Sequence, residues 1–315
     1  MKAKRLVVSF SGGETSALMT HWILNGPMQN EYDDIKVIFA NTGEEREETL
    51  EFVRDCDVRF GFGTIWIEAV IHHNLRKGPT ARVVNFNTAT RKNAVNGPFE
   101  QMIQKYGIPN SKFKHCTRTL KQVPIESYLK DIGWKKDYDL AIGIRSDEID
   151  RVSERAKQRR IIYPLVSCIP TSKPQVNSWW EAQSFRLRLK GYEGNCAWCW
   201  KKSMRKLITL MRENPNHFDF PARMESAYSR VGPEFLKNDW ERSDPLPENY
   251  RRNFFRGNKS VADISDESRR RGSGFIPAVD DHVVYEQFDP ELDVGGGCEE
   301  SCEVFSDEDY HDPEC

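Results

Sequence analysis

Apolar runs and helix-spaced segments alternate along the first half of the chain. Short, almost continuous runs of apolar and β-branched residues predict buried strands, and the amphipathic segments between them predict helices that cover a sheet. We expect strands at residues 6–10, 35–40, 64–70 and 138–144, and helices at residues 16–24, 45–54, 99–106 and 121–129. This alternation predicts the α/β class, with a doubly wound parallel sheet that has helices on both faces.

The pattern changes near residue 161, and we divide the chain there and at two later points. Residues 1–160 form the predicted sheet domain. Residues 161–215, which are rich in Trp and interrupted by Pro, are expected to pack on it and to end in a helix at 202–212. The Pro- and Arg-rich residues 216–285 are expected to be an irregular extension, and residues 286–315 an acidic tail.

Charge is distributed unevenly along the chain. Its net charge is −2, but residues 286–315 contain twelve acids and no Lys or Arg, so removing those twelve negative charges leaves +10. A basic body is suited to an anionic partner such as a nucleotide or a nucleic acid. The tail has few apolar groups to offset the entropy of ordering, so we expect it to be disordered and dispensable for folding.

The apolar runs are too short to cross a membrane, and the first ten residues do not resemble a signal peptide. We therefore expect a cytoplasmic protein without a membrane partner. In that compartment, eight cysteines favour metal binding or redox chemistry over a disulfide framework.

A strand, a glycine turn and a helix start follow one another near the N-terminus. Glycines let the backbone approach a phosphate closely, and the first amides of a helix point at an anion. The lysine of the Gly-Lys-Ser/Thr phosphate loop is missing at the required spacing. The residues expected to bind a nucleotide here are Ser9, Ser11, Gly12, Gly13, Thr15 and Ser16.

Two more polar turns follow predicted strands. Asn41 and Thr42 come directly after the strand at 35–40. Because the carboxyl ends of parallel strands meet at one edge of a sheet, we expect this turn to lie at the same crevice as the glycine turn. The alternative is local: Thr42 begins a helix cap that Glu45 completes.

The second turn contains Gly143, Arg145 and Asp147. A guanidinium binds two oxygens of a phosphate or sulfate at once, and Asp147 or Glu148 would orient it or hold a magnesium ion. The alternative for Arg145 is a surface salt bridge.

Three cysteines have a spacing or setting that suggests chemistry. Cys196 and Cys199 form a Cys-x-x-Cys, which chelates a metal through a tight turn. Cys116 lies near several cations at an expected helix start, where the pKa of a thiol is lowered. Spacing does not distinguish zinc from an iron–sulfur cluster, and a metal-free redox dithiol is a third option.

Several motifs in this order resemble the phosphoadenosine phosphosulfate (PAPS) reductase-like family of the PP-loop, or adenine nucleotide alpha hydrolase-like, superfamily, and especially its phage and prophage members. The similarity is carried by S-G-G-x-x-S at 11–16, C-T-x-x-L-K-x-x-P at 116–124 and G-I-R-x-D-E at 143–148. It covers roughly residues 5–212.

The resemblance implies a Rossmann-like sheet that binds ATP or PAPS, with Asn41 and Thr42 near the base or ribose. It implies that Arg145 faces phosphate or sulfate and that Arg145, Asp147 and Cys116 act in catalysis. It also implies an iron–sulfur cluster on Cys116, Cys196 and Cys199, with zinc as the alternative. The fourth ligand would be Cys168, another group, or an open iron.

The resemblance therefore implies an enzyme that acts on an adenine nucleotide in sulfur transfer or reduction. One alternative is an ATP pyrophosphatase that adenylates a nucleobase or tRNA for thiolation. Another is a non-catalytic nucleotide- or nucleic-acid-binding protein with a structural metal. Expected partners are an adenine nucleotide, a nucleic-acid or tRNA acceptor and a thioredoxin-like reductant. The tail lacks the Glu-Cys-Gly-Leu-His-like segment that ends authentic PAPS reductases.

Overall fold

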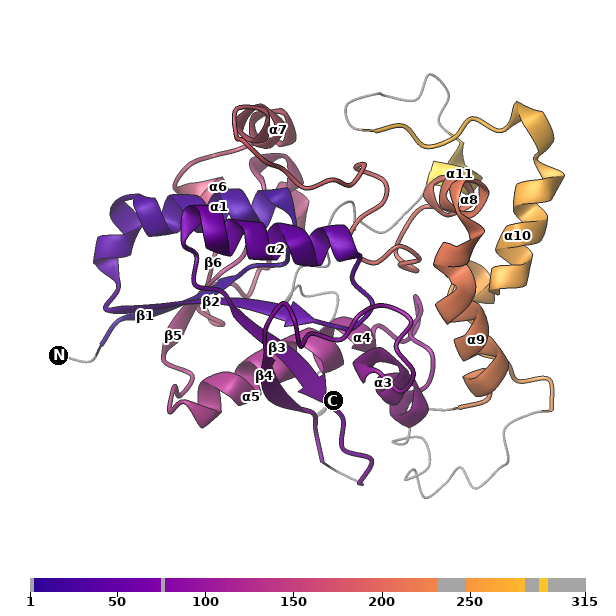
Figure 1. Cartoon of the computed structure of the whole chain (residues 1–315), viewed down its shortest axis with the longest axis horizontal. Coiled ribbons are helices and arrows are strands. Elements are labelled where there is room, and N and C mark those ends of the chain that lie inside the picture. Colours follow the sequence, from indigo (N-terminus) through magenta and orange to yellow (C-terminus); the bar gives the residue numbers. More distant parts are fainter. Residues whose placement is uncertain (1–2, 75–76, 232–247, 281–288, 294–315) are drawn as a thin grey trace.

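A six-stranded sheet forms the centre of the computed structural model, which describes residues 3–74, 77–231, 248–280 and 289–293 (Figure 1). The strand order is β4-β3-β2-β1-β5-β6. Strands β3 and β4 pair antiparallel, and the other neighbours pair in parallel. The fold is α/β and Rossmann-like. The strands are β1 (Arg5–Ser9), β2 (Asp34–Asn41), β3 (Ile65–Val70), β4 (Thr80–Val84), β5 (Tyr138–Ala141) and β6 (Ile161–Ile162).

Helices cover both faces of the sheet, as the alternation of apolar runs predicted. Leu6 and Val8 of β1 pack into one core with α1 (Glu14–Asn25), α2 (Glu47–Phe60) and α7 (Lys173–Glu181). Val7 points the other way and packs against α5 (Val123–Asp131). Figure 1 shows α1 and α2 on one side of the sheet and α5 on the other.

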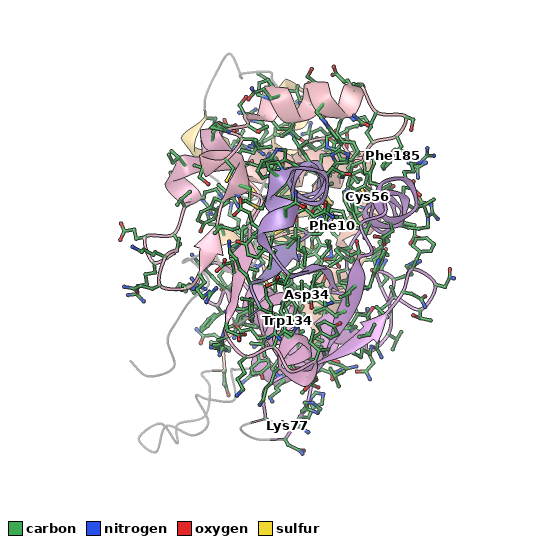
Figure 2. The ribbon with its side chains drawn as sticks, turned by 90° about the vertical axis from the view of Figure 1, so that its left-hand side faces the viewer. Phe10, Asp34, Cys56, Lys77, Trp134 and Phe185 are labelled. Carbon is green, nitrogen blue, oxygen red and sulfur yellow. The ribbon has the colours of Figure 1, made fainter. Side chains whose placement is uncertain are left out.

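The side chains confirm these two layers. Phe10, Cys56 and Phe185 belong to the core under α1 and α2, whereas Trp134 belongs to the core under α5. In Figure 2 the first three lie above Trp134. Cys56 is fully buried, and burial raises the pKa of its thiol, so this cysteine is a packing residue.

The edge strands were not expected from the sequence. In β4, Arg82 and Val83 are exposed, so its five residues show neither a buried apolar run nor a regular alternation. Strand β6 has only two residues. Both depend on pairing with an existing neighbour, which a local pattern does not reveal.

A second core lies beside the sheet and joins distant parts of the chain. It packs Phe99, Leu120, Trp198, Phe220 and Phe254 together. Figure 1 shows the later helices gathered at this end of the sheet. The helices here are α3 (Pro98–Tyr106), α4 (His115–Thr117), α8 (Met204–Glu213), α9 (Asp219–Tyr228), α10 (Val261–Arg270) and α11 (Pro290–Asp293).

Shorter elements connect these parts. A π-helical turn at Arg118–Gln122 joins α4 to α5, and α6 (Pro164–Ser167) follows β6. The 3-10 turns are Pro27–Glu31, Ser146–Arg151, Pro215–Phe218, Arg256–Asn258 and Gly272–Gly274.

Residues 216–285 are less irregular than expected. They contain α9 and α10, and α10 begins with a capping box in which Ser260 accepts from the amide of Asp263. Ile264 faces the second core and is fully buried, so tertiary packing stabilises a helix in a charged sequence.

The expectation of a disordered tail is wrong for residues 289–293, which form α11 and a turn before it. Arg205 of α8 binds both carboxylate oxygens of Asp293, at 2.6 and 2.7 Å, and Leu292 is 4% exposed. A buried ion pair and an apolar anchor offset the ordering entropy that we assigned to the whole tail. Its other residues, Cys298, Cys302 and Cys315 included, lie outside the described part.

Candidate functional site

Three sequence motifs meet at the carboxyl edge of the sheet. Strand β1 lies between β2 and β5. The strands that follow β1 in sequence are added first on its β2 side and later on its β5 side, so β1 is the point where the strand order reverses. In sheets of this kind a crevice lies beyond the carboxyl ends of the strands at this point. A Cβ added to Gly143 would lie 3.0 Å from the Cα of Ser16. A side chain at 143 would crowd the start of α1, and glycine lets the loop after β5 lie close to it.

The glycine loop is held in shape by its own hydroxyl groups. The Ser11 amide donates to Ser16 Oγ at 3.2 Å, and the two hydroxyls lie 2.8 Å apart. Ser16 Oγ donates to the Gly13 carbonyl at 3.0 Å. Ser9, Ser11, Thr15 and Ser16 are all at least nine-tenths buried, so the loop has a fixed shape at the first amides of α1, where an anion would bind.

Gly12 has a structural requirement of its own. Its φ is +84°, and an added Cβ would lie 2.8 Å from Thr49 Cγ2 and 3.1 Å from the Phe39 ring. A side chain at Gly12 would therefore collide with α2 and β2 rather than with a phosphate in the crevice. Its substitution would test packing more than ligand binding.

Arg145 links the second turn to the glycine loop. Its guanidinium is 4% exposed, its Nε donates to Asp147 Oδ1 at 3.1 Å, and its Nη1 lies 3.5 Å from Thr15 Oγ1. Glu148 lies 3.5 Å from Nη2. Asp147 thus orients the arginine beside the loop, in an ion pair between a buried guanidinium and an exposed carboxylate.

A buried carboxylate also sits at the start of α1. Burial raises the pKa of Glu14, and the Arg186 guanidinium, bound to both of its oxygens at 3.0 and 3.1 Å, opposes that shift. Pairing with Arg186 balances the negative charge next to the loop, which would otherwise repel an anionic ligand.

Asn41 and Thr42 make structural contacts. The Asn41 amide group donates to Glu68 Oε1 at 2.7 Å and to the Thr90 carbonyl at 2.9 Å. The Thr42 amide and hydroxyl both donate to Glu45 Oε2. Helix α2 begins later, so this is a turn and not the helix cap that we considered. Backbone groups remain the candidates for nucleotide contact here.

Cys116, Cys196 and Cys199 line one cavity with about 50 Å³ of free volume. It lies between the Cys-x-x-Cys turn and the start of the helical segment at 115–131. Lys121 lines it as well. Cys116 belongs to α4 and Lys121 to the π-helical turn that follows, and both side chains face the same space.

The lining of this cavity favours a ligand that accepts hydrogen bonds. Trp200 Nε1 and Thr117 Oγ1 are buried in its wall and have no hydrogen-bond partner among the described residues. An indole N–H is a donor only. Lys202 also lines the cavity, with Nζ donating to the Cys196 carbonyl at 2.8 Å, and Lys121 Nζ lies 3.6 Å from Glu45, a carboxylate in the same, mostly apolar wall.

The three thiols line one cavity without forming a site for a single metal ion. Within the described residues, no three His, Cys, Asp or Glu side chains are close enough together to hold one ion. His115, next to Cys116 in the chain, directs Nε2 to the Gly107 carbonyl at 3.1 Å. A cluster spreads its cysteine ligands over several iron atoms, and hydrogen bonds to its sulfurs come from donors such as Trp200.

Cys168 does not join the other three cysteines. It follows α6, is exposed, and is absent from the lining of the thiol cavity. The expectation that it supplies a fourth ligand is therefore wrong for this arrangement. Cys168 belongs to none of the sequence motifs.

Comparison with known proteins agrees with the loop and crevice geometry. Residues 5–77, from β1 past β3, match the family model of the phosphoadenosine phosphosulfate reductase domain. The resemblance to the PAPS reductase-like proteins is confirmed. The matched segment holds the glycine loop and the Asn41–Thr42 turn, but not Arg145 or the three cysteines of the thiol cavity.

The chain is also similar to three curated proteins. An uncharacterized nin region protein, ORF290, of Escherichia phage lambda is 29% identical over 299 residues, which covers 95% of this chain and 94% of the relative. The uncharacterized protein MJ0066 of Methanocaldococcus jannaschii is 24% identical over 67% of this chain and 39% of its own length. Protein MJ0973 of the same archaeon is 26% identical over 39% of this chain.

Asn195 is the residue of this site that the sequence did not reveal. Its Nδ2 donates to the Ser11 carbonyl at 2.7 Å, its Oδ1 accepts from Thr49 at 3.2 Å, and it lines the thiol cavity. It therefore joins the glycine loop to the Cys-x-x-Cys turn. Its position just before Cys196 was the available signal.

In the described part of the chain, no helix is long and apolar enough to span a bilayer.

Proposed function

We propose that this chain is a PAPS reductase-like PP-loop enzyme that acts on an adenine nucleotide, ATP or PAPS, in sulfur transfer or reduction. In this proposal the nucleotide binds at the loop of residues 9–16, and the thiol cavity holds an iron–sulfur cluster on Cys116, Cys196 and Cys199. The observation that carries the proposal is that one residue, Asn195, contacts the loop and lines the cavity. The two sites therefore share a wall.

The chain's own residues would act on the nucleotide by positioning and charge. Amides at the start of α1 would bind a phosphate, and Arg145, oriented by Asp147, would stabilise negative charge that develops at the phosphate or sulfate end. A magnesium ion is compatible with this, since such ions are held by one or two carboxylates together with substrate phosphates. Asp147 is the half-exposed candidate.

A cluster bound in the cavity would supply electrons or carry sulfur. Lys121 and Lys202 would offset its negative charge, and Trp200 would donate to one of its acceptor atoms. Cys116 would act both as a ligand and as the thiol closest to the cationic turn at 118–121. Zinc is the alternative occupant.

An adenylating reaction is the main alternative within this proposal. The ATP pyrophosphatase would release pyrophosphate and activate a nucleobase or tRNA for thiolation, and the +10 charge of the chain without its acidic tail favours it. The reductase would release sulfite from PAPS with a thioredoxin-like reductant. A non-catalytic binding protein with a structural metal would do neither.

Two assays on anaerobically purified protein test the proposal. Absorption spectra with iron, zinc and sulfide analysis identify the occupant of the cavity, and we expect a brown protein with iron and sulfide. Product assays then measure sulfite from PAPS and pyrophosphate from ATP. We expect pyrophosphate release that persists when the chain is ended at Asp293, because that cut keeps α11 but removes all three tail cysteines.

The outcomes separate the alternatives. Sulfite release that disappears with the tail would assign the reductase reaction. Stoichiometric zinc without iron would replace the cluster with a structural metal. If correctly folded and loaded protein releases neither sulfite nor pyrophosphate, the enzymatic proposal is refuted.

A further inference from the structure

Almost all of the net positive charge of residues 1–285 lies in one segment. Residues 69–125 contain ten Lys and Arg but a single acid, Glu100, so their net charge is +9. Glu100 is 7% exposed and pairs with Arg223 at 3.0 Å, so it contributes little negative charge to the surface. We call residues 69–125 the acid-poor segment. It runs from the end of β3 through β4 and α3 to the start of α5.

Several of its cations are exposed and have no ion pair among the described residues. These are Lys77, Lys92, Lys112 and Arg118. Figure 2 shows Lys77 protruding at the lower edge of the molecule. Exposed cations without a counter-charge raise the local potential, whereas the paired Arg82, which is bound to Glu68, does so less.

One loop of the segment is fixed beside the proposed site. The Thr90 amide donates to Glu68 Oε1 at 2.6 Å, and the Asn93 amide donates to Glu44 Oε1 at 3.0 Å. Both carboxyl groups are buried, that of Glu44 in the turn after β2 and that of Glu68 in β3, and the Thr90 carbonyl accepts from Asn41. Residues 85–97 are therefore anchored at the carboxyl edge of the sheet, next to the crevice.

This loop presents amides as well as cations to solvent. Its four asparagines, Asn85, Asn87, Asn93 and Asn96, are all exposed, and Lys92 lies between two of them. Asparagine and lysine side chains bind phosphate oxygens, and asparagine also binds base edges. Large exposed apolar side chains in the described part of the segment are limited to Val83 and Val95, which is too few to insert into a membrane.

We propose that the acid-poor segment binds a nucleic acid through its phosphates, with the loop at 85–97 placing the bound strand beside the crevice and the thiol cavity. Cations spread along the segment suit a long polyanion better than a small ligand. The proposal concerns binding alone, so it stands or falls separately from the reaction proposed above.

Fluorescence anisotropy with the full chain tests this. The probes are fluorescein-labelled single-stranded DNA, single-stranded RNA and duplex DNA, each of about 20 nucleotides, titrated between about 50 and 200 mM salt. The test variant is the triple substitution Lys77→Ala, Lys92→Ala and Lys112→Ala. Its matched control removes three exposed, unpaired cations elsewhere: Lys135→Ala, Arg155→Ala and Lys157→Ala.

At least one probe should bind, and the test variant should bind it about tenfold more weakly at about 100 mM salt, with a log–log salt slope lowered by about 2 to 3. The control should match wild type. Equal losses in both variants, or no binding of any probe, would overturn the proposal. Binding of the full chain to phosphatidylserine vesicles but to no nucleic acid would also overturn it. So would nucleic-acid binding by the chain ended at Asp293 but not by the full chain, because the surface would then be assigned to the protein's own acidic tail.

Discussion

The side-chain amide of Asn195 donates a 2.7 Å hydrogen bond to the backbone carbonyl of Ser11, 184 residues earlier in the chain. This bond joins the turn before Cys196 to the glycine loop at the end of β1. A second bond, from Thr49 at 3.2 Å, keeps the amide in the correct orientation. The position of the Cys-x-x-Cys turn and that of the loop where a phosphate would bind are therefore coupled through Asn195.

Asn195→Ala should lower the free energy of unfolding by about 1–3 kcal/mol, because it leaves a buried carbonyl and hydroxyl without their partner. It should also weaken nucleotide binding. Chemical denaturation and calorimetry measure the two effects. Asn87→Ala, at an exposed asparagine, is the control and should stay within about 0.5 kcal/mol of wild type. A variant at Asn195 that matches this control would show that the bridge is unimportant.

Replacing any one of Cys116, Cys196 and Cys199 by serine should reduce the iron and sulfide content of anaerobically purified protein several-fold, because all three line the same cavity. Cys168→Ser is the matched control, since its thiol is exposed and lies outside the cavity. Elemental analysis and the visible spectrum measure the loss. Loss of iron in the Cys168 variant as well would mean that the ligand set derived from the structure is incomplete.

Ending the chain after Asp293 should leave stability unchanged, whereas ending it after residue 288 should cost about 1–3 kcal/mol. The shorter chain loses the partner of Arg205, whose side chain is 3% exposed, and the apolar anchor Leu292. Thermal and urea unfolding compare the two chains. Equal stability of both would show that α11 contributes nothing to the fold.

Stability should also depend on the protonation of Glu44. Burial raises the pKa of Glu44 from 4.5 to about 8. Between those values the folded protein holds a proton that the unfolded chain has lost, so this group makes the free energy of unfolding fall as pH rises through the window.

Glu44→Gln mimics the protonated form and should flatten that slope between about pH 5 and pH 8. Urea unfolding across this range measures it, with the exposed Glu154→Gln as the control that keeps the wild-type slope. If the Glu44 variant is as pH-dependent as wild type, the carboxyl group is not the source.

The sequence predicted the parts of the fold that depend on local pattern. The strand expected at 35–40 is β2, and the helix expected at 99–106 is α3, because apolar periodicity and glycine or proline boundaries are local signals. Strand β4 and α10 were missed. The first depends on pairing with β3, and the second is stabilised by burial of Ile264 in a core assembled from distant segments.

The candidate site was predicted to a similar extent. Their positions after predicted strands placed the glycine loop, the Asn41–Thr42 turn and Arg145 at one crevice, and the structure brings these turns to one edge of the sheet. The sequence could not show that the side-chain amide of Asn41 is hydrogen-bonded to Glu68 and Thr90, or that Asn195 bridges the two sites. Both facts depend on contacts between segments far apart in the chain.

Calorimetric titration of ATP and PAPS into wild type and into Arg145→Ala tests the central claim most directly. Arg145 lies almost buried beside Thr15 and has the geometry to bind two oxygens of a phosphate or sulfate. We predict that wild type binds at least one of the two nucleotides and that Arg145→Ala weakens binding at least about tenfold, or 1.4 kcal/mol, while the exposed Arg155→Ala leaves it unchanged. Absence of binding to wild type, or equal affinity in all three proteins, would contradict the assignment of this crevice as an adenine-nucleotide site.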